Sequence, residues 1–368
     1  MRIVYMVASL GVGGAEGQVL ALAERMASRG HEVTLVTLLP EAKEEWPTGL
    51  PLIRLNLRKS AFGLNDVLWR TRRILRDLRP QIVHSHSFHA NIIARLACCF
   101  RGGPKAVSTI HNVYEGGWHR MLAYRLSDRM AAHTTAVSQA AAERFLRLKA
   151  VNPKRCSVVV NAIDPEEFAK DKARRARIRE TLGAGDEFVW IAAGRAAPAK
   201  DYPNLLRAFA RVLEFDPNAY LWIAGEGSDR ELGRKINRNW PECVRRQIEC
   251  LGLRRDVAAL LDGADGFVSG SAWEGMPLAI AEAMAMEKPV VATDVGGVRE
   301  LVGECGMLVP ARAPEALAEA MLGIMRRPEA DRRALGRAAR SRVQTSFNIE
   351  SRVDEWVALY NSIAHAEQ

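Results

Sequence analysis

The sequence is poor in cysteine and has no cysteine spacing that would build a disulfide framework or hold zinc. Its 368 residues include six cysteines, of which Cys98 and Cys99 are adjacent and none forms a Cys-x-x-Cys pair. Disulfide-rich and zinc-binding domains need more regular pairs than these. We therefore expect reduced thiols and a cytoplasmic protein.

Long hydrophobic runs are absent as well. No apolar run approaches the roughly 20 residues that a membrane-spanning helix requires. The N-terminal run, residues 1–7, is short and leads into glycines without a small-residue cleavage site, so it does not indicate a signal peptide. Hydrophobic residues make up 48% and charged residues 26% of the chain, which excludes disordered and collagen-like classes. The length exceeds a single core of about 100–200 residues and so predicts two domains.

Several motifs of metal and nucleotide chemistry are also missing. The chain has no Asp-x-Asp, His-Glu-x-x-His or Gly-x-x-x-x-Gly-Lys-[Ser/Thr] segment. The dinucleotide fingerprint is incomplete, because Gly11 and Gly13 are followed by Glu16 where a third glycine belongs. We expect neither a metal site nor a cofactor, so cations and helix N-termini would have to neutralise any bound diphosphate.

Acidic residues are scarce in the first half. Residues 1–165 contain 23 Lys and Arg against 12 Asp and Glu, whereas residues 166–368 contain 29 against 31. A basic half indicates an anionic partner, namely nucleic acid, a phosphorylated ligand or an anionic membrane, or else only a solvated basic surface. The basic residues do not alternate with aromatic residues in a stacking pattern, so we expect no nucleic-acid partner.

Both halves alternate short apolar runs with amphipathic segments, which is typical of parallel sheets wound with helices. We expect strands at residues 2–8, 32–38, 81–84, 106–110, 133–137, 188–193, 220–224, 266–269 and 289–293. We expect helices at residues 15–29, 66–78, 204–214, 277–286 and 349–363. The pattern breaks near Asp164 and Pro165, where a charged run follows. The predicted architecture is α/β, with two Rossmann-like parallel-sheet domains at 1–165 and 166–348 that face a central cleft.

Ligands of such sheets bind beyond the carboxyl ends of the strands, and two loops there carry suitable residues. Gly13 and Gly14 follow the first strand and would let a phosphate approach the backbone, although a tight turn without a ligand gives the same pattern. Arg195 and Lys200 follow a strand of the second half. A bidentate guanidinium beside a point charge suits a diphosphate, and a solvated loop is the alternative.

The segment 271–284 carries the strongest signal. Glu274 lies before a predicted helix that Pro277 would begin, and Glu282 lies inside that helix among alanines and methionines. A carboxylate on a buried face is costly unless it is paired, and ligand hydroxyls are a natural partner. A salt bridge to an arginine, or a helix-capping role for Glu274, is the structural alternative. Backbone N–H groups facing the cleft would come from Gly275, Met276 and Leu278.

Three histidines follow or end strands of the first half. His111 comes directly after the predicted strand 106–110, at the end expected to face the cleft. His84 and His86 are placed similarly but are more ambiguous. A lone histidine is usually structural. The position of His111 at the carboxyl end of a strand nevertheless makes it the candidate for a functional residue.

Together these motifs resemble glycosyltransferase family 4, the retaining enzymes of the GT-B fold, of the bacterial surface-polysaccharide type. The resemblance rests on Gly13-Gly14-Ala15-Glu16, His111, Arg195 with Lys200, and Glu274 with Glu282 in a Glu-x7-Glu pattern. It continues through residues 289–297 and 306–310 and so spans nearly the whole chain. Within 161–164 an alanine stands where the family often has glycine, and the acceptor-binding residues stay unassigned.

The resemblance implies roles for these residues in binding a nucleotide-sugar donor. Arg195 and Lys200 would neutralise its diphosphate, with the backbone of Gly14 near the distal phosphate. Glu282 would bind the ribose hydroxyls, and Glu274 would contact the donor sugar. The other implied contacts are Gly13, the loop of Gly275, Met276, Pro277 and Leu278 around sugar and phosphate, and His111 beside the reacting carbon.

The implied reaction moves a hexosyl or N-acetylhexosaminyl group from a UDP-sugar to a glycan or a polyprenyl-diphosphate-linked acceptor, with retention of configuration. The acceptor would react on the face of the leaving group, whose phosphate takes the acceptor's proton, so no protein nucleophile is needed. The N-terminal domain would bind the acceptor, and the helix within 349–368 would pack back onto it. A nucleotide-sugar epimerase of the same fold and a non-catalytic sugar-nucleotide-binding scaffold are the alternatives.

The predicted helix 66–78 is strongly basic. Its cations are Arg70, Arg72, Arg73 and Arg76, and Arg58 and Lys59 precede it. Each cation near an anionic bilayer contributes about 1 kcal/mol to binding. We hypothesise a peripheral enzyme on the inner face of the cell membrane, against the alternative of a solvated face.

Overall fold

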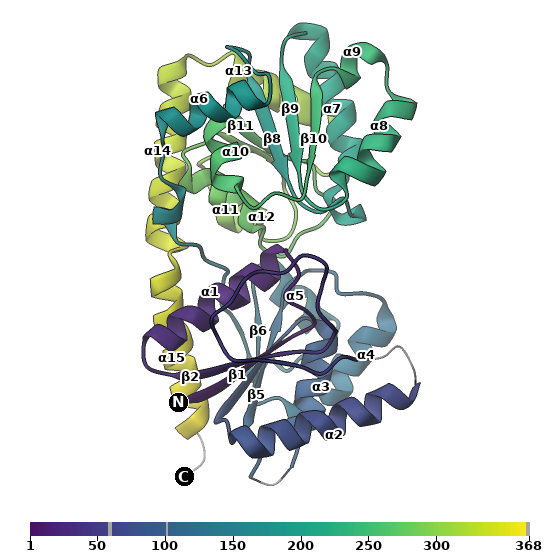
Figure 1. Cartoon of the computed structure of the whole chain (residues 1–368), viewed down its shortest axis with the longest axis vertical. Coiled ribbons are helices and arrows are strands. Elements are labelled where there is room, and N and C mark those ends of the chain that lie inside the picture. Colours follow the sequence, from purple (N-terminus) through teal and green to yellow (C-terminus); the bar gives the residue numbers. More distant parts are fainter. Residues whose placement is uncertain (58–60, 101, 366–368) are drawn as a thin grey trace. The chain divides into compact units, whose positions relative to one another are not determined.

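The computed structural model describes residues 1–57, 61–100 and 102–365, which form two compact units (Figure 1). Unit 1 comprises Met1–Ala162 together with the C-terminal segment from Ile349, and unit 2 comprises Ile163–Asn348. Arg58, Lys59 and the last three residues of the predicted C-terminal segment, 366–368, lie outside the described residues. Among the residues described, no helix is long and apolar enough to cross a membrane.

The described part of unit 1 contains a seven-stranded parallel sheet in the order β3-β2-β1-β4-β5-β6-β7. Its strands are β1 (Arg2–Val7), β2 (Glu32–Thr37), β3 (Leu52–Arg54), β4 (Ile82–His86), β5 (Lys105–Ile110), β6 (His133–Ala136) and β7 (Cys156–Val158). Side chains alternate across the sheet because a strand has a period of two. Tyr5 of β1 therefore enters one core cluster and Met6 enters the other. Burial on both faces explains why β1 is a continuous apolar run.

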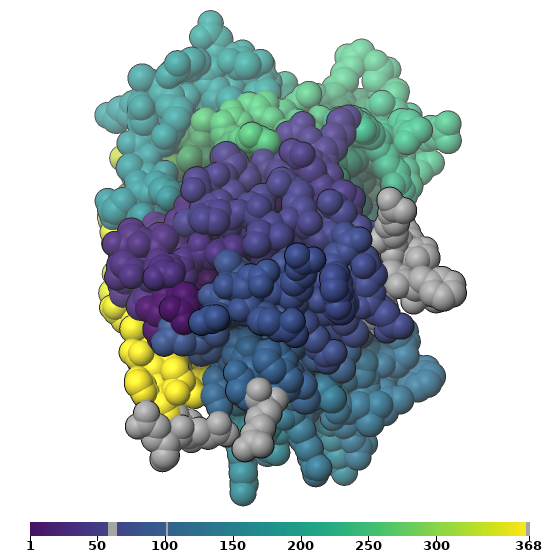
Figure 2. Space-filling model, turned by 60° about the horizontal axis from the view of Figure 1, so that its bottom comes forward, coloured from purple at the N-terminus to yellow at the C-terminus, as the bar shows by residue number. Residues whose placement is uncertain are grey.

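The helices of unit 1 cover the two faces of this sheet. They are α1 (Gly14–Ser28), α2 (Ala61–Leu78), α3 (Phe88–Cys98), α4 (Trp118–Ser127), α5 (Gln139–Arg147) and α15 (Ile349–His365). The C-terminal helix α15 packs in the same cluster as α1 and β1, where it buries Trp356 and Tyr360. Figure 2 shows its yellow atoms beside the purple start of the chain. Arg29, directly after α1, also pairs with Glu350 of α15 at 2.7 Å, so the chain ends on the unit in which it begins.

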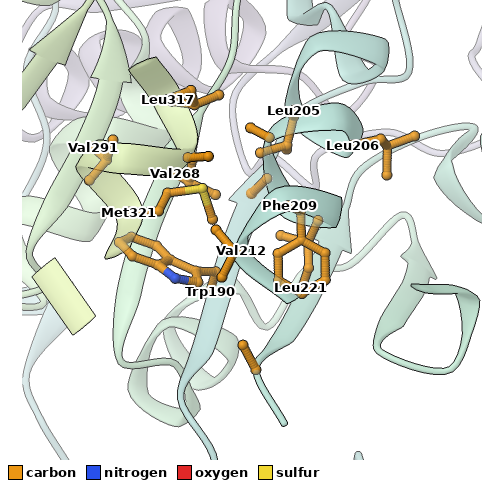
Figure 3. Packing of buried hydrophobic residues seen from close by; sticks show 14 of the residues in the cluster. Trp190, Leu205, Leu206, Phe209, Val212, Leu221, Val268, Val291, Leu317 and Met321 are labelled. Atoms are coloured by element: carbon orange, nitrogen blue, oxygen red, sulfur yellow. The ribbon is translucent and has the colours of Figure 1, made fainter. Parts of the chain in front are cut away.

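Unit 2, which is described throughout, is a six-stranded parallel sheet in the order β10-β9-β8-β11-β12-β13. Its strands are β8 (Val189–Ala193), β9 (Tyr220–Ala224), β10 (Ile248–Gly252), β11 (Gly266–Ser269), β12 (Val290–Thr293) and β13 (Met307–Val309). Its helices are α6 (Lys172–Thr181), α7 (Tyr202–Phe215), α8 (Gly233–Asn239), α9 (Glu242–Arg245), α10 (Val257–Gly263), α11 (Leu278–Ala285), α12 (Val298–Val302), α13 (Pro314–Met325) and α14 (Glu329–Ser346). Trp190 of β8 packs with Phe209 of α7 and Met321 of α13 (Figure 3).

The predicted α/β class with two Rossmann-like parallel sheets is confirmed. The predicted strands and helices form, and α2 begins at Ala61 rather than Asp66. The short strands β3, β7, β10 and β13 and several helices were not predicted. Helix α14 shows why, because its buried face consists of small or medium residues, Gly336, Ala339 and Val343, and these give little apolar periodicity.

Candidate active site

The predicted residues of unit 2 gather at the carboxyl ends of β8 and β11, which are neighbours in the sheet. Arg195 follows β8, Lys200 ends a short 3-10 turn after it, and Glu274 follows β11. Adjacent parallel strands end at the same edge of a sheet, and the backbone N–H of Ala272 donates to the carbonyl of Ala199 at 2.8 Å. The loops that carry Lys200 and Glu274 are therefore tied together.

Lys200 and Glu274 form an ion pair in which Nζ lies 2.7 Å from Oε1. The side chains are 23% and 9% exposed. Ser271 Oγ donates to the same Oε1 at 2.7 Å, and none of the described residues donates to Oε2. The partner of Glu274 is thus a lysine rather than the arginine of the structural alternative. A Cβ at Gly194 would lie 2.6 Å from Cε of Lys200, so the glycine leaves room for the lysine.

Arg195 is exposed and pairs with Glu226, with Nε 3.0 Å from Oε2. An exposed ion pair of this kind contributes little to stability, so the guanidinium of Arg195 remains available to an anion. The loop that carries it is anchored by its backbone, since Ala196 N–H donates to the carbonyl of Glu226 at 2.8 Å. Arg195 and Lys200 together give this strand end two cations.

Glu282 lies on α11 and is half-buried. No described residue donates a hydrogen bond to its carboxylate or forms an ion pair with it, so the arginine salt bridge is not found. Burial raises the pKa of Glu282 to about 7; the charge of Glu167 adds to the rise and the charge of Lys200 opposes it. A carboxylate without a donor is unfavourable in this environment, and a ligand hydroxyl would satisfy it.

Pro277 does not begin the helix as predicted. It keeps an extended backbone, with φ −78° and ψ 110°, and α11 begins at Leu278. The carbonyl of Gly275 accepts from the N–H of Gly297 at 2.8 Å, and Met276 is buried. These contacts hold the loop before α11, whose first N–H groups have no intrahelical partner.

In unit 1, His111 lies directly after β5 and is held at two points. Its Nε2 is 2.9 Å from Nδ1 of His86, and its backbone N–H donates to Oε1 of Glu115 at 3.0 Å. Burial lowers the pKa of His111 to about 4, so the ring is neutral at pH 7.

The other two histidines differ from each other. Nδ1 of His84 lies 2.6 Å from the hydroxyl of Tyr360, and Nε2 lies 2.7 Å from Oγ1 of Thr109. Both ring nitrogens of His84 are satisfied within the core, so it is structural. His86, in contrast, contacts His111.

Sequence reasoning missed Glu115. This half-buried carboxylate accepts from Tyr124 OH at 2.6 Å as well as from the His111 backbone, and desolvation raises its pKa. It therefore fixes the turn that carries His111. Only its position a few residues after His111 could have pointed to it.

Gly13 and Gly14 lie where α1 starts. Gly13 has an extended backbone and precedes the helix, and its carbonyl accepts from Gly17 N–H at 2.9 Å. The first N–H groups of α1 are thus at the carboxyl end of β1, where an anion is favoured. Within the described ranges of the chain, no group of three or more His, Cys, Asp and Glu side chains is placed to hold a metal ion.

Two family models match the chain. Residues 12–167 match the model described as Glycosyltransferase Family 4, and residues 187–327 match the model described as Glycosyl transferases group 1. The chain is 27% identical to UDP-Gal:alpha-D-GlcNAc-diphosphoundecaprenol alpha-1,3-galactosyltransferase of Escherichia coli over 78% of this chain and 77% of that one. It is 25% identical to alpha-monoglucosyldiacylglycerol synthase of Acholeplasma laidlawii over 76% of each. Its fold resembles Anabaena Alr3699/HepE, solved with UDP and glucose, with a TM-score of 0.86 at 20% identity over 98% of this chain and 100% of that one.

Proposed function

We propose a reaction for this chain on the basis that it belongs to glycosyltransferase family 4 and has the GT-B fold. It transfers a hexosyl or N-acetylhexosaminyl group from a UDP-sugar to a polyprenyl-diphosphate-linked glycan. The transfer retains the anomeric configuration and needs no metal. The observation that carries the donor site is the half-buried Glu282 carboxylate, which has no donor among the described residues although Lys200 is close enough to shift its pKa. A ligand that carries hydroxyls and negative charge would bind the Glu282 carboxylate through the hydroxyls and Lys200 through the charge.

Unit 2 is the proposed nucleotide-sugar-binding unit. We assign the diphosphate to Arg195 and Lys200, the ribose hydroxyls to Glu282, and the donor sugar to Glu274. Support for UDP comes from the Anabaena structure, which holds UDP and glucose, and from the Escherichia coli relative, whose name specifies UDP-Gal. We assign the loop around sugar and phosphate to Gly275, Met276, Pro277 and Leu278.

The proposed reaction breaks the bond between the anomeric carbon and the diphosphate oxygen. Negative charge then builds on the leaving diphosphate, where preorganised cations stabilise it without reorganisation. The acceptor oxygen bonds to the same face of the anomeric carbon, and its proton passes to the leaving phosphate oxygen. Glu274 is not assigned as a nucleophile, because in this same-face reaction the leaving phosphate takes the acceptor's proton and no protein nucleophile is needed.

Unit 1 is the proposed acceptor-binding unit, and the acceptor is proposed from charge and from a relative. This half carries the excess of basic residues, 23 against 12 over residues 1–165, which suits a diphosphate-linked lipid. The Escherichia coli relative is named for a diphosphoundecaprenol-linked acceptor. We assign His111 to the donor sugar and reacting carbon, and Gly13 with Gly14 to the distal phosphate.

An anionic membrane surface on the cytoplasmic face is part of this proposal. Trp118, Leu122 and Leu126 of α4 are 78%, 44% and 72% exposed, and a spacing of four places them in one stripe of the helix. Arg125 and Arg129 are exposed beside them. Apolar side chains flanked by cations are typical of a helix that lies in the interface of an anionic bilayer.

The test begins with the donor. UDP-, GDP- and ADP-sugars are screened by thermal shift, where a ligand at 100 times its Kd stabilises by about 2.7 kcal/mol. The stabilising sugar is then incubated with synthetic polyprenyl-diphosphate-sugar acceptors, with and without EDTA, and the product's anomeric configuration is read by NMR. A retained anomer formed equally in EDTA is expected. Conversion of the donor to an epimer without acceptor would instead establish the epimerase, and donor binding without any turnover would establish the scaffold.

A further inference from the structure

The imidazoles of His86 and His111 share one hydrogen bond across neighbouring strands. His86 ends β4, and it pairs with Thr109 in the register of β4 with β5, two residues before His111. The bond joins His86 Nδ1 to His111 Nε2 at 2.9 Å, and the ring centroids are 5.1 Å apart. The register therefore places His111 near His86, two residues beyond the strand partner of His86.

Each of these rings has one nitrogen left over. His86 Nε2 and His111 Nδ1 are buried, and neither has a partner among the described residues. Burial lowers the pKa of both histidines, and the charges of His84 and His111 add to the effect at His86. Both rings are thus neutral at pH 7, and each carries one N–H.

One shared bond between two neutral rings couples their tautomers. If His86 Nδ1 carries the proton and donates, His111 carries its own proton on Nδ1 and presents a donor there. If His111 Nε2 donates, its Nδ1 is a bare acceptor. The proton on the bond between His86 and His111 therefore decides whether His111 Nδ1 is a donor or an acceptor.

The ring of His84 packs against the ring of His86. The ring of His84 lies 4.0 Å from it, centroid to centroid, and His84 is fixed by its bonds to Tyr360 and Thr109. The backbone of His111 is held separately by Glu115. With the backbone fixed, the contact that orients the His111 ring is His86.

We propose that His86 is a positioning residue, which fixes the ring of His111 and its tautomer. This inference rests on the proposed assignment of His111 to the sugar. It applies to the sugar step rather than to binding of the ribose and diphosphate, which we assign to Glu282, Arg195 and Lys200. His86 does not itself touch the substrate.

The experiment compares three substitutions of His86. His86→Asn places an amide near the position of Nδ1 and keeps a partner for His111 Nε2, His86→Leu fills the space without a partner, and His86→Gln carries its amide one methylene too far. We expect His86→Leu and His86→Gln to lower kcat by about tenfold or more with donor KM within about threefold, because a lost orienting contact costs rate rather than affinity. His86→Asn should recover most of the rate.

Ring-nitrogen NMR of 15N-labelled protein supplies a readout that a merely structural role would not move. The His111 tautomer ratio should match the unsubstituted protein in His86→Asn and change in His86→Leu. His133→Leu is the matched control, since His133 Nε2 also makes a side-chain hydrogen bond between neighbouring strands, to Ser157 Oγ at 2.9 Å, on another pair of strands. It should change neither His111 nor kcat.

The inference is overturned if His86→Leu leaves the His111 resonances and kcat unchanged, or if Leu and Asn lower kcat equally while the resonances stay in place. If His86→Leu does not fold, the contrast between Asn and Gln decides by the same criteria. Absence of transfer by the unsubstituted protein with every donor would defeat the proposed function alone, because the NMR comparison still decides whether His86 sets the tautomer.

Discussion

Lys200 Nζ lies 2.7 Å from Oε1 of Glu274, 74 residues further along the chain. The pair joins the loop after β8 to the loop after β11, and Ser271 donates to the same oxygen. A diphosphate that binds here meets a lysine that is already held in place, so little side-chain entropy is lost on binding. The second oxygen, Oε2, is left for a sugar hydroxyl.

Lys200→Ala should weaken binding of the UDP-sugar and lower turnover strongly while the protein stays folded. A hydrogen bond to a charged group contributes about 1.5–3 kcal/mol, so the Kd measured by calorimetry should rise about tenfold or more. Lys235→Ala is the control, because Lys235 is an exposed lysine of the same unit that pairs with Glu231 in the π-helical segment directly before α8. Equal affinities for both variants would contradict the assignment of Lys200 to the diphosphate.

Glu282→Ala should also weaken binding of the UDP-sugar. The lost contacts should be those to the ribose and not those to the phosphates. The carboxylate has no donor among the described residues, so ribose hydroxyls would be its first partners and their loss should raise the Kd about tenfold or more. Calorimetry with UDP and with inorganic diphosphate separates the two parts. We expect the loss for UDP only, and an unchanged UDP affinity in the folded variant would remove the ribose assignment.

The Glu282 carboxylate should make the protein less stable as the pH rises. Burial raises the pKa of Glu282 from 4.5 to about 7 in the folded state. The unfolded chain therefore ionises first, and stability is lost as the pH rises from about 4.5 to about 7. Each pKa unit is worth about 1.4 kcal/mol, so the loss by pH 7 is on the order of 3 kcal/mol.

Glu282→Gln removes the titration and should flatten this part of the profile. Urea unfolding at several pH values measures the difference between the two proteins. The unsubstituted protein should lose stability relative to Glu282→Gln as the pH increases across the window. A difference that stays constant from pH 4.5 to 7.5 would mean that the carboxylate is well solvated.

Local patterns predicted the sheet edges at which the site forms but not the contacts made there. Apolar runs located β8 and β11, and the residues after them, Lys200 and Glu274, then had to meet at one edge. The bond between His86 and His111 depends on the register of β4 with β5, which no single segment specifies. Glu115 gives no signal either, because its contact with the hydroxyl of Tyr124 depends on how α4 folds back after the turn.

Membrane association is the prediction that the structure changes most. Of the arginines on α2, Arg70 pairs with Asp66 at 2.9 Å, Arg72 donates to the carbonyl of Leu96 at 3.0 Å, and Arg73 lies over the ring of Trp69. These side chains stay exposed but are partly engaged. Replacing Arg70, Arg72, Arg73 and Arg76 with Gln should therefore weaken binding to anionic liposomes at low salt, by about tenfold or more, and have little effect at high salt.

The exposed stripe of α4 predicts a second effect that salt does not remove. Replacing Trp118, Leu122 and Leu126 with Ser takes away the apolar side chains that would enter the interface, while the cations remain. Binding should fall about tenfold or more at both low and high salt, since burial of apolar area is not screened. Cosedimentation with anionic and neutral liposomes over a salt series measures both effects. Phe215 is an exposed aromatic residue of unit 2, and the control variant Phe215→Ser should bind as the unsubstituted protein does.

If the unsubstituted protein stays in the supernatant with both lipids at low salt, no membrane surface is involved. If only the arginine variant loses binding, the contact is electrostatic and α4 takes no part in it.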